Sequence, residues 1–148
     1  MLLSRYVTGT SKSERWLRPR SALCKRINPH FLFSALNALA ALATVAPREV
    51  PLATGWLRQY LRASFDQQER ILVSLEEELG VVRAYLDIES LRFGSRLKVE
   101  QTINLGLLKV LIPPFSFKPL VENAIQYGLR SSPQAGRLRL VVRTAADG

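Results

Sequence analysis

A single histidine near the start of a helical pattern is the first residue in this sequence that could do chemistry. His30 is the only histidine of the chain and follows Asn28-Pro29, a helix start, since Asn caps free amides and Pro is tolerated at the first helical position. Ser34 and Asn37 follow at helical spacing, which predicts one polar stripe with His30. An exposed imidazole is a competent nucleophile toward phosphoryl groups near neutral pH. A surface or capping histidine without chemistry is the alternative.

A second polar pair lies near the other end of the chain. The segment 120–128 reads Leu-Val-Glu-Asn-Ala-Ile-Gln-Tyr-Gly, and we expect a helix from about Pro119 to Gly128. Asn123 and Tyr127 are four residues apart and project together. The residues predicted to form a broad apolar side against a sheet are Leu120, Val121, Ala124 and Ile125. The alternative is an amphipathic helix with an incidental asparagine.

Two helices are predicted before residue 73. The first runs from Asn28-Pro29 to the stop at Pro47, and its apolar stripe is Leu32, Ala35, Leu36, Leu39 and Ala43. The second runs from Pro51 to Ser64, and its stripe is Leu52, Trp56, Tyr60 and Ala63. A helical hairpin of this kind cannot bury both faces alone. We therefore expect a homodimer that completes a four-helix bundle.

The second half of the sequence mixes helix and strand patterns. Ser74 and Glu77 form a capping box that begins a helix to about Phe93. Alternating residues predict strands at 96–103 and 137–143, with a short strand at 110–112. The fold class predicted is α+β, in two modules. The predicted boundaries are a basic flexible lead-in at 1–26, a dimerisation hairpin at 27–73 and an α/β sandwich at 74–148.

Composition excludes several classes of protein. With 148 residues and 47% hydrophobic residues, the chain can build a core. Its longest nearly unbroken apolar run, Ala35 to Ala46, is shorter than the roughly 20 residues that span a bilayer. The N-terminus has no signal-peptide pattern, so a cytoplasmic location is expected. The lone Cys24 cannot form an internal disulfide, and no Cys/His cluster suits zinc.

The net charge of +9 is concentrated at the N-terminus. A single acid, Glu14, accompanies seven basic residues there: Arg5, Lys12, Arg15, Arg18, Arg20, Lys25 and Arg26. A basic surface attracts nucleic acid or an anionic membrane. This clustering favours a flexible or juxtamembrane arm, able to contact an anionic membrane, over a folded nucleic-acid reader. A plain solvated arm is the alternative.

Several motifs together resemble those of LytS-type sensor histidine kinases. The sequence Ile-Asn-Pro-His-Phe-Leu-Phe at 27–33 is similar to the phosphoacceptor box of this family. The resemblance continues, in the family's order and spacing, through Leu-Glu-Glu-Glu-Leu at 75–79, Tyr-Leu-Asp-Ile-Glu at 85–89 and Pro-Leu-Val-Glu-Asn-Ala-Ile at 119–125. It implies that His30 accepts the γ-phosphoryl group of ATP, and that the second module is part of an Hsp90-like ATPase domain.

The same resemblance assigns the remaining site. Asn123 would bind Mg²⁺ in the N box, Tyr127 would contact the nucleotide base, and Glu122 would polarise water or a metal-bound oxygen, or else pair with a basic neighbour. ATP and Mg²⁺ are the implied cofactors. The implied partners are a second copy of the chain and a response regulator, of the LytTR type, which would receive the phosphoryl group from His30.

The sequence also departs from the family's pattern. The family commonly has Asn at the position of Ser34, Gln at Lys118, and Lys-His at Gln126-Tyr127. No Asp-x-Gly-x-Gly box, which binds adenine in the family, follows Asn123, so we expect a truncated kinase. The alternative is a catalytically inert dimerisation module derived from such a kinase.

Overall fold

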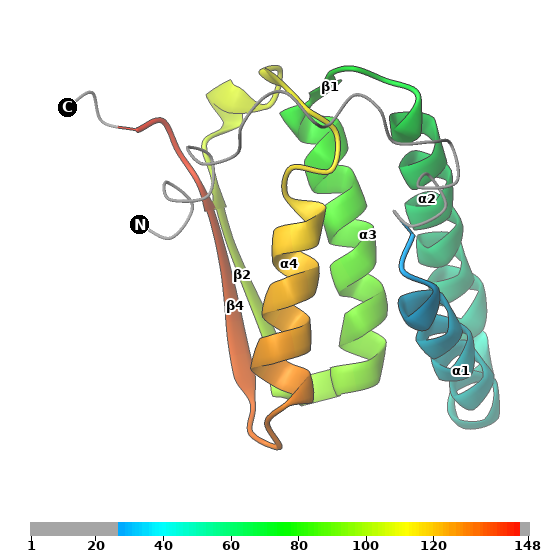
Figure 1. Cartoon of the computed structure of the whole chain (residues 1–148). Coiled ribbons are helices and arrows are strands. Elements are labelled where there is room, and N and C mark those ends of the chain that lie inside the picture. Colours follow the sequence, from blue (N-terminus) through cyan, green and yellow to red (C-terminus); the bar gives the residue numbers. More distant parts are fainter. Residues whose placement is uncertain (1–26, 146–148) are drawn as a thin grey trace.

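The computed structural model describes residues 27–145, so the predictions for the basic arm at 1–26 and for Cys24 lie outside the described residues. Four α-helices and two small sheets make an α+β fold, as predicted. Helices α1 and α2 lie side by side, α3 packs on α2, and the strands β2 and β4 lie on the side of α3 and α4 away from α1 and α2 (Figure 1). Among the described residues no helix is long and apolar enough to cross a membrane.

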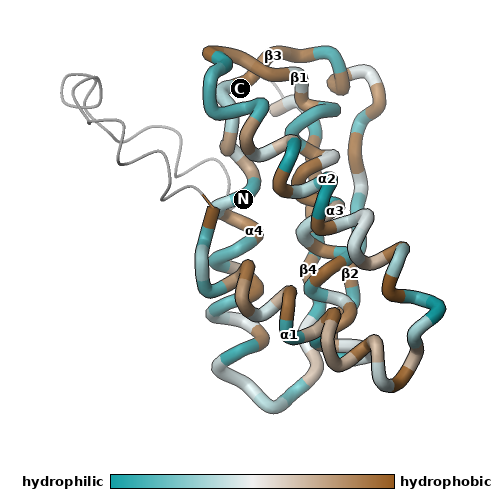
Figure 2. The backbone as a smooth tube through the Cα atoms, turned by 90° about the vertical axis from the view of Figure 1, so that its right-hand side faces the viewer, coloured by the Kyte–Doolittle hydropathy of each residue, from teal (hydrophilic) through white to brown (hydrophobic). Residues whose placement is uncertain are grey.

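Helix α1, Pro29–Val45, begins and ends where the sequence predicts. The Asn28 side chain accepts hydrogen bonds from the backbone N–H groups of His30 and Phe31. Only Phe31 and Ala35 of this helix are buried. The predicted stripe was therefore wrong in part, because Leu36 is exposed and Phe31 enters the core instead. The tube of α1 in Figure 2 is nevertheless coloured as apolar over much of its length, which leaves an apolar face without a partner in the monomer.

Helix α2, Val50–Gln68, follows the short 3₁₀ turn Pro47–Glu49. The prediction of its buried face was wrong in part, because most of the buried residues lie one position after the predicted ones. Tyr60 is buried as expected, but Leu52 is 59% exposed. The residues that α2 buries are Ala53, Leu57, Tyr60, Ser64 and Gln67. The face of α2 that bears Leu52 is thus left open, like the outer face of α1.

Helix α3, Leu75–Phe93, forms the centre of the molecule. The predicted capping box is confirmed, because the Ser74 side chain accepts from the Glu77 N–H and the Glu77 carboxylate accepts from the Ser74 N–H. Ten residues of α3 are buried, on more than one face, since α2 packs on one side and α4 on another. One hydrophobic core joins Phe31 and Tyr60 to α3, α4 and the strands, and so crosses residue 73.

The strands pair in two sheets. β1, Val73–Ser74, is antiparallel to β3, Leu111–Ile112. β2, Leu97–Ile103, is parallel to β4, Gly136–Val142, with Leu97 opposite Gly136 and Ile103 opposite Val142. The three predicted strands are thereby confirmed within one or two residues. Between β3 and β4 the chain forms α4, Lys118–Ile125, and the π-helical turn η6, Gln126–Arg130.

Candidate functional site

His30 lies at the exposed start of α1. Its neighbour Phe31 is 2% exposed, and the Phe31 ring packs against the rings of Tyr60 and Tyr85 at centroid distances of 4.9 and 4.8 Å. The Phe31 ring thus fixes the first turn of α1, while the side chain of the preceding residue, His30, remains in solvent. The predicted exposed histidine is therefore present, and its ring is accessible as nucleophilic chemistry requires.

The His30 ring meets the C-terminal end of the α4 segment. Nη1 of Arg130, the last residue of η6, lies 3.1 Å from Nδ1 of His30. The two residues are 100 positions apart in the sequence. The fold therefore brings the histidine box and the segment with Asn123 and Tyr127 into one region within a single chain.

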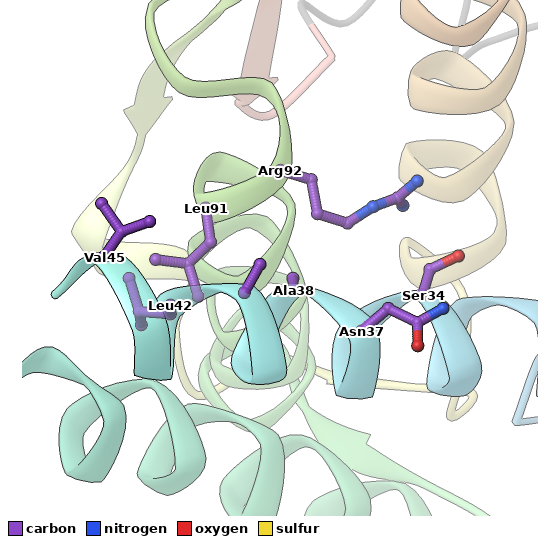
Figure 3. Close-up of a pocket in the computed structure, with 8 residues that line it drawn as sticks. Ser34, Asn37, Ala38, Leu42, Val45, Leu91 and Arg92 are labelled. Carbon is purple, nitrogen blue, oxygen red and sulfur yellow. The ribbon is translucent and has the colours of Figure 1, made fainter. Parts of the chain in front are cut away.

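A groove follows the polar stripe of α1 toward the end of α3. Its volume is about 590 Å³. Ser34, Asn37 and Arg92 lie at one end, and Leu42, Val45 and Leu91 lie at the other (Figure 3). Ser34 and Asn37 of the predicted polar stripe thus line an open groove, which is polar at their end and apolar at the other, while His30 is not among its lining residues.

Helix α4 turns a different face inward from the one predicted. Val121 and Ile125 are buried as expected, but Leu120 is 37% exposed and Ala124 is exposed. The prediction was wrong for these two because Lys118 and Leu129 occupy the inward positions instead. Asn123 and Tyr127 are both exposed. The residues implied to bind Mg²⁺ and the nucleotide base therefore lie on the solvent side of the segment.

Glu122 points away from solvent, toward α2. Its Oε1 accepts a hydrogen bond from the Tyr60 hydroxyl at 3.4 Å and lies 3.7 Å from Nζ of Lys118. Burial raises the pKa of Glu122 more than Lys118 and the Tyr60 hydrogen bond lower it, and burial lowers the pKa of Lys118. Lys118 also lies 4.9 Å from the Tyr60 ring centroid. Glu122 therefore has the basic neighbour, Lys118, that the alternative prediction for this residue requires.

Glu78 holds the start of α4 on α3. Its side chain is fully buried, and its two carboxylate oxygens accept from the backbone N–H groups of Phe115, Phe117 and Lys118 at 3.0, 2.9 and 3.3 Å. These amides belong to the turn before the helix and to its first residue, where a negative charge also complements the helix dipole. Phe115 adopts a positive φ of 61°, an uncommon conformation that these bonds help to maintain.

Glu89 forms a second buried carboxylate, on the His30 side of α3. Arg92 donates to both of its oxygens, at 2.9 and 3.2 Å. Burial raises the pKa of Glu89, while the charges of Arg92, Arg130 and His30 lower it. A buried carboxyl group that interacts electrostatically with both His30 and Arg130 therefore lies close to their contact.

The exposed residues of α4 and η6 suit part of a magnesium–nucleotide site. Mg²⁺ prefers oxygen ligands and is commonly held by few protein groups together with phosphate oxygens. Asn123 offers one accessible amide oxygen, and Tyr127, 71% exposed, offers a ring face. In the part of the chain that the structure describes, no group of three or more His, Cys, Asp or Glu residues could hold a metal alone. Asn123 and Tyr127 therefore fit a nucleotide that brings its own metal-binding oxygens.

Three residues of this region were missed from the sequence. Arg130 had no signal, because nothing local connects it to a helix start 100 positions earlier. Glu89 stands inside a quoted family motif, but that motif carried no role for it. Glu78 also lies in such a motif, and its burial could not be foreseen in a run of three glutamates.

Comparisons with known proteins identify the family of the chain. Residues 20–97 match the model of a family described as histidine kinase. The chain is 38% identical over 106 residues to the sensor protein LytS of Bacillus cereus, covering 72% of this chain and 18% of the relative. It is 35% identical over 118 residues to the sensor histidine kinase BtsS of Escherichia coli, covering 80% and 21%. The chain thus spans about a fifth of the length of these relatives. This chain belongs to the LytS-type sensor histidine kinase family.

Proposed function

We propose that this chain is the dimerisation and phosphoacceptor part of a two-component sensor histidine kinase, together with the first elements of its ATP-binding domain. In this proposal His30 accepts the γ-phosphoryl group of Mg-ATP and passes it to an aspartate of a response regulator. The observation that supports it most directly is the 3.1 Å approach of His30 to the end of the segment that carries Asn123. The nucleophile thus contacts the C-terminal end of the segment whose exposed residues suit a nucleotide.

The side chains divide the work as follows. Bound ATP would supply the activated phosphoryl group. His30 contributes the ring nitrogen that forms the new bond to phosphorus, and its exposure leaves room for attack. Asn123 and Tyr127 hold the metal and the base on the outer face of α4. Glu122 positions α4 through Lys118 and Tyr60, as its half-buried carboxylate favours.

Dimerisation is the second part of the proposal. Phe33 is 67% exposed and Leu36 is 47% exposed, on the side of α1 opposite its core residues Phe31 and Ala35. Leu52 adds an apolar side chain from α2. Exposed apolar surface of this extent favours an interface, and a helix pair from a second copy would cover it in a four-helix bundle.

The dimer is tested by Leu36→Glu, with Gln101→Glu as the control because both add one negative charge to an exposed position. Sedimentation equilibrium of the unmodified chain is expected to show a dimer. Leu36→Glu should weaken association at least about tenfold, since a charge at an apolar interface is left unpaired. A monomeric unmodified chain would refute this part.

Phosphate transfer is tested with labelled ATP and an intact kinase of the same family. We expect acid-labile, alkali-stable label on this chain and none on the His30→Gln variant. Because His30 is the only histidine of the chain, the assignment needs no peptide mapping. Label on His30→Gln would exclude His30 as the acceptor.

The second candidate function is an inert dimerisation module that acts through α1 and α2 alone. The exposed apolar residues Phe33, Leu36 and Leu52 support it as well as they support the kinase. The labelling experiment separates the two, because a dimer that never acquires label would favour the inert module. Stoichiometric binding of ATP to this chain at micromolar concentration would contradict the inert module, which should have no measurable affinity for ATP.

A further inference from the structure

The contact between Arg130 and His30 restricts the chemistry of the His30 ring. A guanidinium group only donates hydrogen bonds and remains charged in proteins, so Nη1 of Arg130 is the donor and Nδ1 of His30 is the acceptor at 3.1 Å. A neutral imidazole carries one N–H and one in-plane lone pair. If Nδ1 accepts, the ring proton is on Nε2.

The backbone around Arg130 is held by two contacts that do not involve His30. Leu129, the preceding residue, is 4% exposed and belongs to the core. Nη2 of Arg96 donates to the carbonyl oxygens of Leu129 and Ser132, on either side of Arg130. The fold therefore presents the Arg130 side chain from a fixed base, while its guanidinium and the imidazole are both in contact with water.

Phosphoryl transfer to His30 cannot proceed while this contact persists. The reaction forms a bond from a ring nitrogen to the γ-phosphorus, breaks the bond to the bridging oxygen, and leaves that electron pair on the departing diphosphate. The ring proton then passes to water. Nδ1 cannot attack because its lone pair accepts from Arg130, and Nε2 cannot attack because it bears the proton. Moving the proton to Nδ1 also requires Arg130 to leave.

We propose that Arg130 is a gating residue that holds His30 in an unreactive tautomer and must move away before phosphate is transferred. This inference rests on the proposed role of His30 as phosphoacceptor. Because both groups are exposed, the gate opens at a small cost, with water replacing either partner. Rotation of the Arg130 side chain away from His30 when nucleotide engages Asn123 and Tyr127 on the same segment would open it.

The tautomer can be observed directly, since the chain has one histidine. Nitrogen NMR of the ring at a pH where it is neutral should show Nε2 protonated and Nδ1 accepting in the unmodified chain. Arg130→Met removes the donor and keeps the side-chain length, so the Nδ1 signal should move toward that of a free ring. Arg130→Lys retains a donor and should lie between the two. Arg137→Met, an exposed arginine on β4, is the matched control and should change nothing.

Nucleophilicity gives a second readout that needs neither ATP nor a kinase. Diethyl pyrocarbonate is attacked by the free lone pair of imidazole, and mass spectrometry of the His30 peptide follows the product. We expect Arg130→Met to react about threefold to tenfold faster than the unmodified chain, the range for one exposed charge-assisted hydrogen bond. Equal rates and equal ring spectra in both proteins would overturn the gate.

Labelling by an intact kinase completes the test. Faster phosphorylation of Arg130→Met supports the gate, whereas slower phosphorylation means that Arg130 assists transfer and overturns it. If no variant ever acquires phosphate although the reagent rates differ as expected, the proposed function fails and the control of His30 by Arg130 stands.

Discussion

At the start of α4, the buried carboxylate of Glu78 accepts from three backbone N–H groups, whereas at the end of η6 the exposed Arg130 makes one hydrogen bond to the exposed His30. Lost bonds at the first end leave amides unpaired in the interior. Water can replace a lost bond at the other end. The comparison teaches that one segment can carry a buried contact that is costly to lose and an exposed side-chain contact with the phosphoacceptor that is easily broken.

The largest expected effect comes from the fixed end. Glu78→Gln keeps the shape of the side chain but replaces one acceptor oxygen with an N–H donor that faces other donors. We expect the free energy of unfolding to fall by about 2–4 kcal/mol. Urea denaturation followed by circular dichroism measures it. Glu76→Gln, which loses an exposed ion pair with Lys109 in the first turn of α3, should change it much less. Similar losses in the two variants would contradict the comparison.

A smaller effect is expected from losing the hydrogen bonds that hold the backbone on either side of Arg130. Arg96→Met removes the donors to the carbonyl oxygens of Leu129 and Ser132, together with the cation–π contact of the guanidinium with the Phe93 ring. The free energy of unfolding should fall by about 1–2 kcal/mol, and amide hydrogen exchange of η6 should become faster. The α4 amides next to Glu78 should remain protected. Equal acceleration over the whole segment would show that its two ends are not independent.

The pH dependence of stability tests the environment of Glu89, the buried carboxyl group near the His30–Arg130 contact. Burial raises the folded-state pKa of Glu89 above its ordinary value of 4.5, so the native protein binds this proton more tightly than the unfolded chain. Its contribution to stability is complete below that value and is lost as pH rises through the folded pKa. The Glu89→Gln variant should therefore show a smaller decrease in stability on going from pH 4.5 to 7.

Part of the decrease in stability between pH 4.5 and 7 should remain in the Glu89→Gln variant, because burial also raises the pKa values of Asp87 and Glu122. Urea denaturation at a series of pH values gives both slopes. If the free energy of unfolding of Glu89→Gln depends on pH as steeply as that of the unmodified chain, burial does not raise the pKa of Glu89 in the folded protein.

The smallest effect on stability is expected from the gate itself. Arg130→Met should change the free energy of unfolding by no more than about 0.5 kcal/mol, because both partners in its contact with His30 are exposed. Thermal unfolding is the measurement. A loss as large as that of Glu78→Gln would assign Arg130 to the structural core of the fold and not to a movable contact.

Most limits of the helices and strands could be predicted from the sequence because their signals are local. The predictions were wrong where α2 continues beyond Ser64 to Gln68 and α4 ends at Ile125 before Gly128, and the short strand β1 was missed. Asn28 caps α1 through amides two and three residues away, and Ser74 and Glu77 cap α3 within one turn. Alternation alone placed β2 and β4. The exposed His30 followed from its position beside Asn28-Pro29, where the next residue and not the histidine enters the core.

Which faces are buried, and what each site residue touches, depended on tertiary packing. Glu122 meets Tyr60 across 62 positions, Glu78 meets the α4 amides across 37 to 40, and His30 meets Arg130 across 100. No local pattern encodes such pairs, because they form only when α3 brings α2 and α4 to its two sides. The sequence by itself determined the four helices, the strands β2, β3 and β4, and the exposed nucleophile. The tertiary structure decided that Glu122 faces an ion pair and that an arginine covers the nucleophile's lone pair.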